Sequence, residues 1–179
     1  MAQTYKMTIA GLERELPICP LNDKIDIAAF IIFSDVELTV AASQELLKKC
    51  PDFDVILTAE SKGIPLAYEM SRQCGKPYVV ARKSMKLYMT NPISVKIKSI
   101  TTAGEQSLYI SEEKARMLKG KRVLITDDVI STGESLRGLE NLVEAVGADI
   151  SARAAILAEG DAADRTDIIF LEKLPLLFK

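Results

Sequence analysis

Short apolar runs alternate along this chain with longer segments of helical periodicity, and this alternation most constrains what the chain can fold into. Four runs have the length of buried parallel strands: 54–58 (DVILT), 78–81 (YVVA), 122–126 (RVLIT) and 151–158 (SARAAILA). Helical periodicity covers residues 37–50, 65–74 and 135–146. The alternation predicts an α/β fold with a mostly parallel central sheet flanked by helices.

Length and composition favour one compact domain over residues 1–179. A chain of 179 residues, 48% apolar and 27% charged, can build one core and does not have the composition of a disordered chain. Lys and Arg number 23 against 25 Asp and Glu, so no basic field favours nucleic acid. No stretch approaches the roughly 18 to 20 apolar residues that span a bilayer, and no secretory signal is visible. We therefore expect a cytoplasmic protein without nucleic-acid or membrane partners.

The three cysteines give no sign of a disulfide framework or a zinc site. Cys19, Cys50 and Cys74 are odd in number and widely spaced, and no CxxC is present. We interpret them as reduced, structural thiols.

The segment after the third apolar run combines two acids with a small polar loop. Asp127 and Asp128 stand at the expected end of the strand, and the next helix should begin within the loop Ser131, Thr132, Gly133, Glu134 and Ser135. Glycine and free amides at a helix start can hold a phosphate, whereas the two carboxylates suit sugar hydroxyls, a cation or a developing positive charge. A strand-end turn or a helix N-cap alone would explain either half, but not both in tandem.

Residues 123–135, VLITDDVISTGES, resemble the signature with which type I phosphoribosyltransferases bind 5-phosphoribosyl 1-pyrophosphate (PRPP). The resemblance implies that Asp127 and Asp128 bind the ribose 2- and 3-hydroxyls and that the loop 131–135 wraps the 5-phosphate. Glu134 departs from the family, which more often has a small residue there. The fold implied is that of a type I phosphoribosyltransferase, with a small hood at about 1–36 and a flexible β-ribbon lid at about 84–108.

A second loop follows the first strand of the expected sheet. Alone, Glu60, Ser61, Lys62 and Gly63 would be a surface turn. In purine members of the family, an acid, Ser, a basic residue and Gly at this place bind pyrophosphate. The resemblance implies the same role here, and a strained peptide bond could lie within the loop.

A basic pair follows the strand at 78–81. Arg82 and Lys83 could be ordinary surface residues, but they are very similar to the "VxxRK" segment of adenine and xanthine phosphoribosyltransferases. The resemblance implies that both contact the leaving pyrophosphate and assist catalysis, joined by Lys86.

The lid and the hood should decide the acceptor base. Residues 93–100 alternate as in a half-exposed ribbon, and the lid lacks the aromatic–Glu pair usual in adenine enzymes, although Glu105 could serve from a shifted position. The polar lid is closer to xanthine enzymes and to the ligand domain of the purine repressor. By resemblance the base site lies near Phe33, Leu157 and Glu159; Phe33 could instead be core. Residues 168–171 and the ending LPLLF resemble the last strand and tail of adenine enzymes.

The function implied is that of a purine phosphoribosyltransferase of purine salvage, with adenine preferred and xanthine or guanine as the alternative. Mg²⁺ would be carried by PRPP, with no direct protein ligands required, and the family implies a homodimer. A non-catalytic PRPP sensor is the rival, because ESKGIPLAYE is very similar to the repressor's loop. Against it, we expect the fewer than 60 residues before Glu60 to form a hood and a first helix, not a winged-helix domain. A P-loop hydrolase is excluded by the lack of GxxxxGK[ST], and a receiver domain would not need the Thr-Gly loop.

Overall fold

The computed structural model describes residues 3–97 and 106–179 and contains a five-stranded central sheet. The strand order is β10-β9-β8-β4-β5, and each neighbouring pair is parallel, as the alternation predicts. The bounds are β4 Val55–Ala59, β5 Tyr78–Ala81, β8 Arg122–Ile130, β9 Asp149–Glu159 and β10 Ile169–Leu174. The four predicted strands are therefore present, and β8 and β9 run longer than expected.

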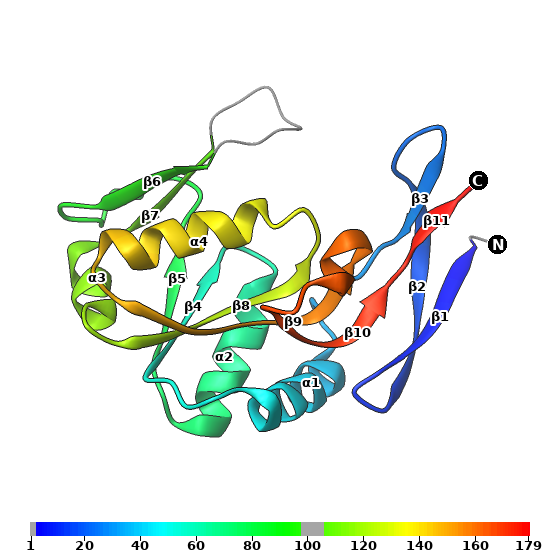
Figure 1. Ribbon diagram of the computed structural model, residues 1–179, viewed down its shortest axis with the longest axis horizontal. Coiled ribbons are helices and arrows are strands. Elements are labelled where there is room, and N and C mark those ends of the chain that lie inside the picture. The colour runs from blue at the N-terminus through cyan, green and yellow to red at the C-terminus, as the bar shows by residue number, and fades with distance from the viewer. Residues whose placement is uncertain (1–2, 98–105) are drawn as a thin grey trace.

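Helices cover both faces of this sheet (Figure 1). They are α1 Val36–Lys49, α2 Gly63–Cys74, α3 Glu112–Leu118 and α4 Glu134–Ala145, with a short 3-10 helix, η1, at Gly160–Asp164. Successive residues of β4 point to opposite faces: Ile56 belongs to the buried cluster that contains Leu38 of α1, whereas Leu57 belongs to the one that contains Leu139 of α4. The sheet is buried on both sides, which explains its uninterrupted apolar runs.

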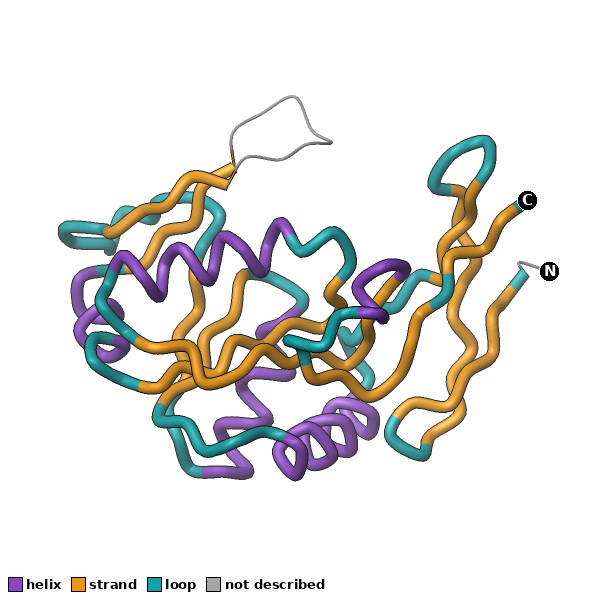
Figure 2. The backbone as a smooth tube through the Cα atoms, viewed as in Figure 1, coloured by secondary structure: helices purple, strands orange, loops and turns teal. Residues whose placement is uncertain are grey.

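A four-stranded antiparallel sheet forms the hood, and it differs from the prediction. It is built from β1 Thr4–Ile9, β2 Leu12–Pro20, β3 Ile25–Ala28 and β11 Leu176–Phe178, in the order β1-β2-β3-β11. The expected hood at 1–36 lacks its fourth strand, because β11 comes from the C-terminal end and pairs with β3. Both ends of the described chain therefore meet at the hood (Figures 1 and 2).

The expected ribbon is present in part. Strands β6 Ile93–Ile97 and β7 Gln106–Ile110 pair antiparallel, whereas residues 84–92 form a loop without strand structure. Residues 98–105 lie outside the described part of the chain, so the role considered for Glu105 is not addressed. Figure 1 shows the ribbon beside α4, and Gly138 allows the close approach, since a Cβ there would overlap Ile97 and lie 3.1 Å from Leu108 Cδ1.

Within the described ranges, no helix is long and apolar enough to cross a membrane.

Candidate functional site

Two neighbouring strands of the central sheet separate at the site. Strand β4 pairs with β8 as far as Leu57 and Ile125, while β8 continues beside β9 to Ile130 and Ala158. Asp127 and Asp128 therefore lie inside β8, not at its end as predicted, because β9 still provides a partner there. Beyond Ile125, the flank of β8 that faced β4 is next to the start of α2.

The carboxyl group of Asp127 is packed against this helix start. A Cβ on Gly63, the first residue of α2, would overlap the Thr58 hydroxyl and lie 3.1 Å from Asp127 Oδ1. Glycine thus allows α2 to approach β8 closely. Burial, and after it the neighbouring charge of Asp128, together raise the pKa of Asp127 to about 8.

Asp128 is buried and has a basic partner from the second predicted loop. Its side chain is 4% exposed, and its Oδ2 lies 3.0 Å from Lys62 Nζ. Glu159, at the end of β9, is near the same lysine: burial raises the pKa of Glu159, and the charge of Lys62 partly opposes that rise. The structure thus brings together Lys62, Asp127, Asp128 and Glu159, which come from three separate segments of the sequence.

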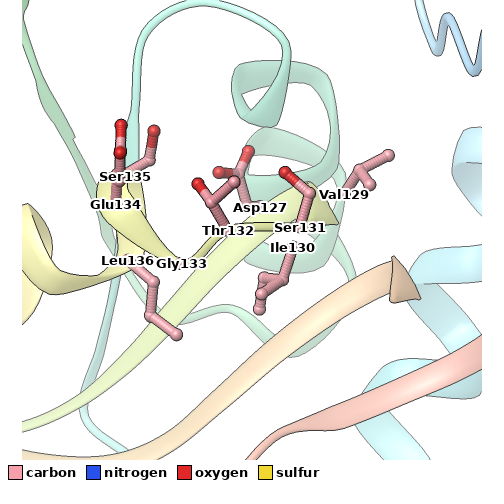
Figure 3. A pocket seen from close by; sticks show the side chains of 9 residues that line it. All are labelled: Asp127, Val129, Ile130, Ser131, Thr132, Gly133, Glu134, Ser135 and Leu136. Carbon is pink, nitrogen blue, oxygen red and sulfur yellow. The ribbon is translucent and has the colours of Figure 1, made fainter. Parts of the chain in front are cut away.

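The loop after β8 surrounds a pocket with about 240 Å³ of empty space that is open to solvent. Figure 3 shows the side chains of Asp127, Ser131 and Thr132 on one side of this loop, whereas Ile130 and Leu136 point the other way and are buried in the core. The remaining lining residues are Val129, Gly133, Glu134 and Ser135. The predicted loop 131–135 therefore lines one pocket together with Asp127.

Gly133 makes this pocket's backbone possible. It is the N-cap of α4 and has a φ of 78°, in the left-handed region that disfavours a side chain. The first amides of α4 are thereby directed at the pocket without a side-chain cap, which leaves donors for an anion.

Loop 60–63 and the basic pair after β5 are joined through Glu60. Its Oε2 lies 2.6 Å from Arg82 Nε, and its Oε1 accepts a hydrogen bond from the Lys83 amide at 2.5 Å. The unusual peptide bond expected in this loop is present, because the bond between Glu60 and Ser61 is cis. Lys86 lies farther along the same loop as Arg82, where it donates to Ser84 at 2.6 Å.

The three residues expected at the base site lie in different environments. Phe33 is 45% exposed and therefore outside the core. Glu159 is half-buried beside the acidic pair, as described above. Leu157 is fully buried in the core cluster that also contains Leu16 of β2 and Leu38 of α1, so its side chain does not face an open site.

Two neighbours of the site were not predicted. The Thr58 hydroxyl is buried beside Gly63, and Arg165 Nη1 would lie 3.0 Å from a Cβ on Gly133. Arg165 is held by Asp167, which accepts hydrogen bonds of 2.9 and 2.7 Å. A threonine inside an apolar strand and an arginine in the polar loop DAADRTD carry no local signal of their position.

The chemistry of the site suits a phosphorylated sugar with a good anionic leaving group. One end offers helix amides and hydroxyls, the middle offers two carboxylates, and the far end offers Lys62 and Arg82. Within the described residues, no three His, Cys, Asp or Glu side chains gather in a way that could hold a metal alone. Two carboxylates do fit a magnesium ion that obtains its other ligands from substrate oxygens.

Comparisons with known proteins identify the domain family. Residues 35–171 match the model of the phosphoribosyl transferase domain. The chain is 37% identical over 128 residues to adenine phosphoribosyltransferase of Cenarchaeum symbiosum, covering 70% of this chain and 72% of that protein. It is 34% identical over 116 residues to hypoxanthine/guanine phosphoribosyltransferase of Methanothermus fervidus, which covers 65% of this chain and only 58% of the relative's length.

A solved structure shares the fold across nearly the whole chain. Adenine phosphoribosyltransferase of Thermoanaerobacter pseudethanolicus superposes with a TM-score of 0.69 at 22% identity, covering 96% of this chain and 95% of that one. The fold of this chain therefore occurs in a solved structure over 96% of its length.

Proposed function

Since the chain belongs to the phosphoribosyl transferase domain family, we propose that it transfers the 5-phosphoribosyl group of PRPP to a purine nitrogen, releasing pyrophosphate and forming a purine nucleoside 5'-monophosphate. The observation that carries the proposal is the meeting of three features at one edge of the sheet. These are the acid pair of β8, the Gly133 loop, and Lys62 in contact with Asp128.

In the proposed reaction, each part of the site has one task. Amides and hydroxyls of residues 131–135 hold the 5-phosphate. Asp127 and Asp128 bind the ribose hydroxyls and stabilise the positive charge that grows on the ring as the bond from C1 to pyrophosphate breaks. The purine nitrogen forms the new bond to C1, and the departing pyrophosphate takes the electron pair of the broken bond. The proton that the base loses when this bond forms passes to the pyrophosphate or to solvent. Lys62, Arg82 and Lys83, with Lys86 nearby, stabilise the charge that this group gains.

Mg²⁺ bound through PRPP would neutralise charge on the pyrophosphate, and the carboxylates of Asp127 and Asp128 are the side chains that would help to hold it. Positioning and electrostatics, and no nucleophilic side chain, then supply the rate. The ribbon would close over PRPP and exclude water from the reactive ribosyl centre.

Adenine is the first choice of base, supported by the adenine relative that matches over most of its length. Hypoxanthine or guanine is the second choice, because a relative with that specificity is similar in identity. We propose that the base lies between Phe33, which is 45% exposed, and Glu159, which is half-buried.

We also propose a homodimer located in the cytoplasm. Leu87 and Met85, in the loop that carries Lys86, are large apolar residues exposed at 108% and 63%, and a second copy would cover them. Light scattering after size exclusion would report the mass.

A base-panel assay tests the function. Protein with Mg²⁺, PRPP and each of adenine, hypoxanthine, guanine and xanthine is analysed by mass spectrometry, and we expect one monophosphate to accumulate with stoichiometric pyrophosphate. Binding of PRPP without consumption of any base would instead indicate a PRPP sensor. If PRPP is not bound, the proposal fails.

A further inference from the structure

Glu60 is an acid in a loop expected to bind an anion. Both of its carboxylate oxygens are already used: Oε2 lies 2.6 Å from Arg82 Nε, and Oε1 accepts from the Lys83 amide at 2.5 Å. A carboxylate would repel pyrophosphate, and this one is directed at the basic pair. Its side chain is 17% exposed and that of Arg82 is 33% exposed, so the ion pair is partly shielded from solvent.

Arg82 is fixed from several directions. Its backbone exchanges two hydrogen bonds with Tyr109 of β7, at 2.9 and 2.8 Å, so the base of the ribbon holds its main chain. Its Nη1 lies 3.3 Å from the Tyr88 hydroxyl. The Glu60 carboxylate lies beside Nε, next to the side-chain stem, as an ion pair that lacks the geometry of a hydrogen bond, and its charge holds the guanidinium on this side while the Nη groups remain the outer end.

Holding this side chain in advance matters for binding. A free arginine loses considerable rotamer freedom when it is ordered on a ligand, and this entropy cost weakens affinity. With Glu60 in place, much of that ordering has already occurred.

We propose that Glu60 is a positioning residue that orients Arg82 toward the leaving pyrophosphate and is not itself a pyrophosphate ligand. This inference rests on the proposed function, which places pyrophosphate beside Arg82. Glu60 also links loop 60–63 to the base of the ribbon, because Arg82 is bound to Glu60 through its side chain and to Tyr109 through its backbone.

The effect of Glu60→Gln on pyrophosphate affinity distinguishes a positioning role of Glu60 from simple repulsion of the anion. If Glu60 only adds negative charge near the anion, Glu60→Gln removes repulsion and tightens pyrophosphate binding. If Glu60 orients Arg82, the same substitution weakens binding. We expect pyrophosphate affinity, measured by calorimetry with Mg²⁺, to fall about tenfold, equal to ~1.4 kcal/mol. Affinity for ribose 5-phosphate, which occupies the other end of the site, should not change.

A double-mutant cycle tests whether Glu60 acts through Arg82. Arg82→Gln alone should weaken pyrophosphate binding, and adding Glu60→Gln to it should cause no further loss. Glu45→Gln, in an exposed ion pair with Lys48 on α1, is the matched control and should leave pyrophosphate binding unchanged. If Glu60→Gln does not fold, Glu60→Asp keeps the charge but shortens its reach, and it should also weaken pyrophosphate binding.

Each outcome has a defined meaning. Unchanged or tighter pyrophosphate binding by the Glu60 variant overturns the inference, as does an equal loss in the Arg82→Gln background. A wild-type protein that binds neither PRPP nor pyrophosphate overturns the proposed function itself, so the two failures are distinguishable.

Discussion

In the protein without a bound cation or substrate, the carboxyl group of Asp127 is held in an environment that favours its neutral form. It lies against the start of α2, beside Gly63 and the buried Thr58 hydroxyl, with the charge of Asp128 next to it in the strand. Burial is the main cause of its raised pKa, and the charge of Asp128 is the second. The protein therefore gives up stability at this residue to keep two acids side by side, as sites for binding and catalysis often do.

The stability of the protein should depend on pH through this group. An unfolded Asp has a pKa near 3.9, and the folded value is about 8, so the folded state holds a proton that the unfolded state has released. The contribution of Asp127 to the free energy of unfolding is therefore fully present below about pH 4, and it is lost as the pH rises toward the folded pKa. Asp127→Asn removes this loss. Circular dichroism gives the melting temperature of the variant and of the wild type. We expect the difference, variant minus wild type, to increase from pH 5 to pH 8.

An exposed acid in the neighbouring strand provides the control for this measurement. Asp149→Asn, at the start of β9, should give a difference in melting temperature that changes little over the same range. A difference for Asp127→Asn that stays constant or shrinks toward pH 8 would contradict the assigned environment.

For individual residues, the sequence predicts sites whose members are adjacent in the chain, but not contacts between residues that are distant in the chain. Asp127, Asp128 and loop 131–135 could be predicted because they form one continuous pattern. The contact of Gly63 with Thr58 and Asp127 could not, since it depends on how closely α2 approaches β8. The partner of Glu60 was likewise hidden, because a carboxylate in an anion-binding loop has no visible reason to be there until Arg82 is placed beside it.

Among the elements, the ribbon and α4 form a unit that no local pattern indicates. The ribbon packs on α4 at Gly138, where a side chain would overlap Ile97 and approach Leu108. The strands of the central sheet were predictable because burial on both faces makes them continuously apolar. Helix α3 has only seven residues, too few for its periodicity to be recognised. The length of β8 also escaped prediction, because its acids look like a strand end unless β9 is known to continue beside them.

Gly138→Ala should loosen the ribbon more than it affects the whole fold. Alanine favours the helix by about 1 kcal/mol over glycine, whereas overpacking costs about 1–3 kcal/mol, and the side chain that must move belongs to β6. We expect faster hydrogen exchange at the amides of β6 and β7, with little change in the central sheet. Mass-spectrometric exchange measures both regions in one experiment.

The control for this substitution lies on the exposed side of the same helix. Asn141→Ala raises helix propensity without facing the ribbon, and it should leave exchange in β6 and β7 as in the wild type. Wild-type exchange rates in Gly138→Ala would show that the ribbon does not depend on this contact.

Taken as a whole, the molecule joins its two ends in the hood. Strand β11 pairs with β3, and the Lys179 ammonium lies 3.0 Å from Asp26. Leu176 also packs beside Gly160, where a Cβ would lie 3.1 Å from Leu176 Cδ1, directly after Glu159. A three-residue strand whose partner lies near the other end of the chain has no recognisable pattern of its own, which explains why the hood was expected from residues 1–36 alone.

Removing β11 should therefore separate donor binding from use of the base. Without residues 175–179, β3 loses one neighbour and the segment after Glu159 loses its contact with Leu176, while Leu174 of β10 stays buried in the central sheet. We expect the shortened protein to retain its far-ultraviolet circular dichroism and its calorimetric affinity for PRPP but to lose most of its turnover with the preferred purine. Lys179→Ala, which removes the ion pair and keeps β11, should retain turnover. Full purine turnover without β11 would mean that the hood acts through β1 to β3 alone, whereas loss of PRPP affinity would mean that the two sheets are stable only together.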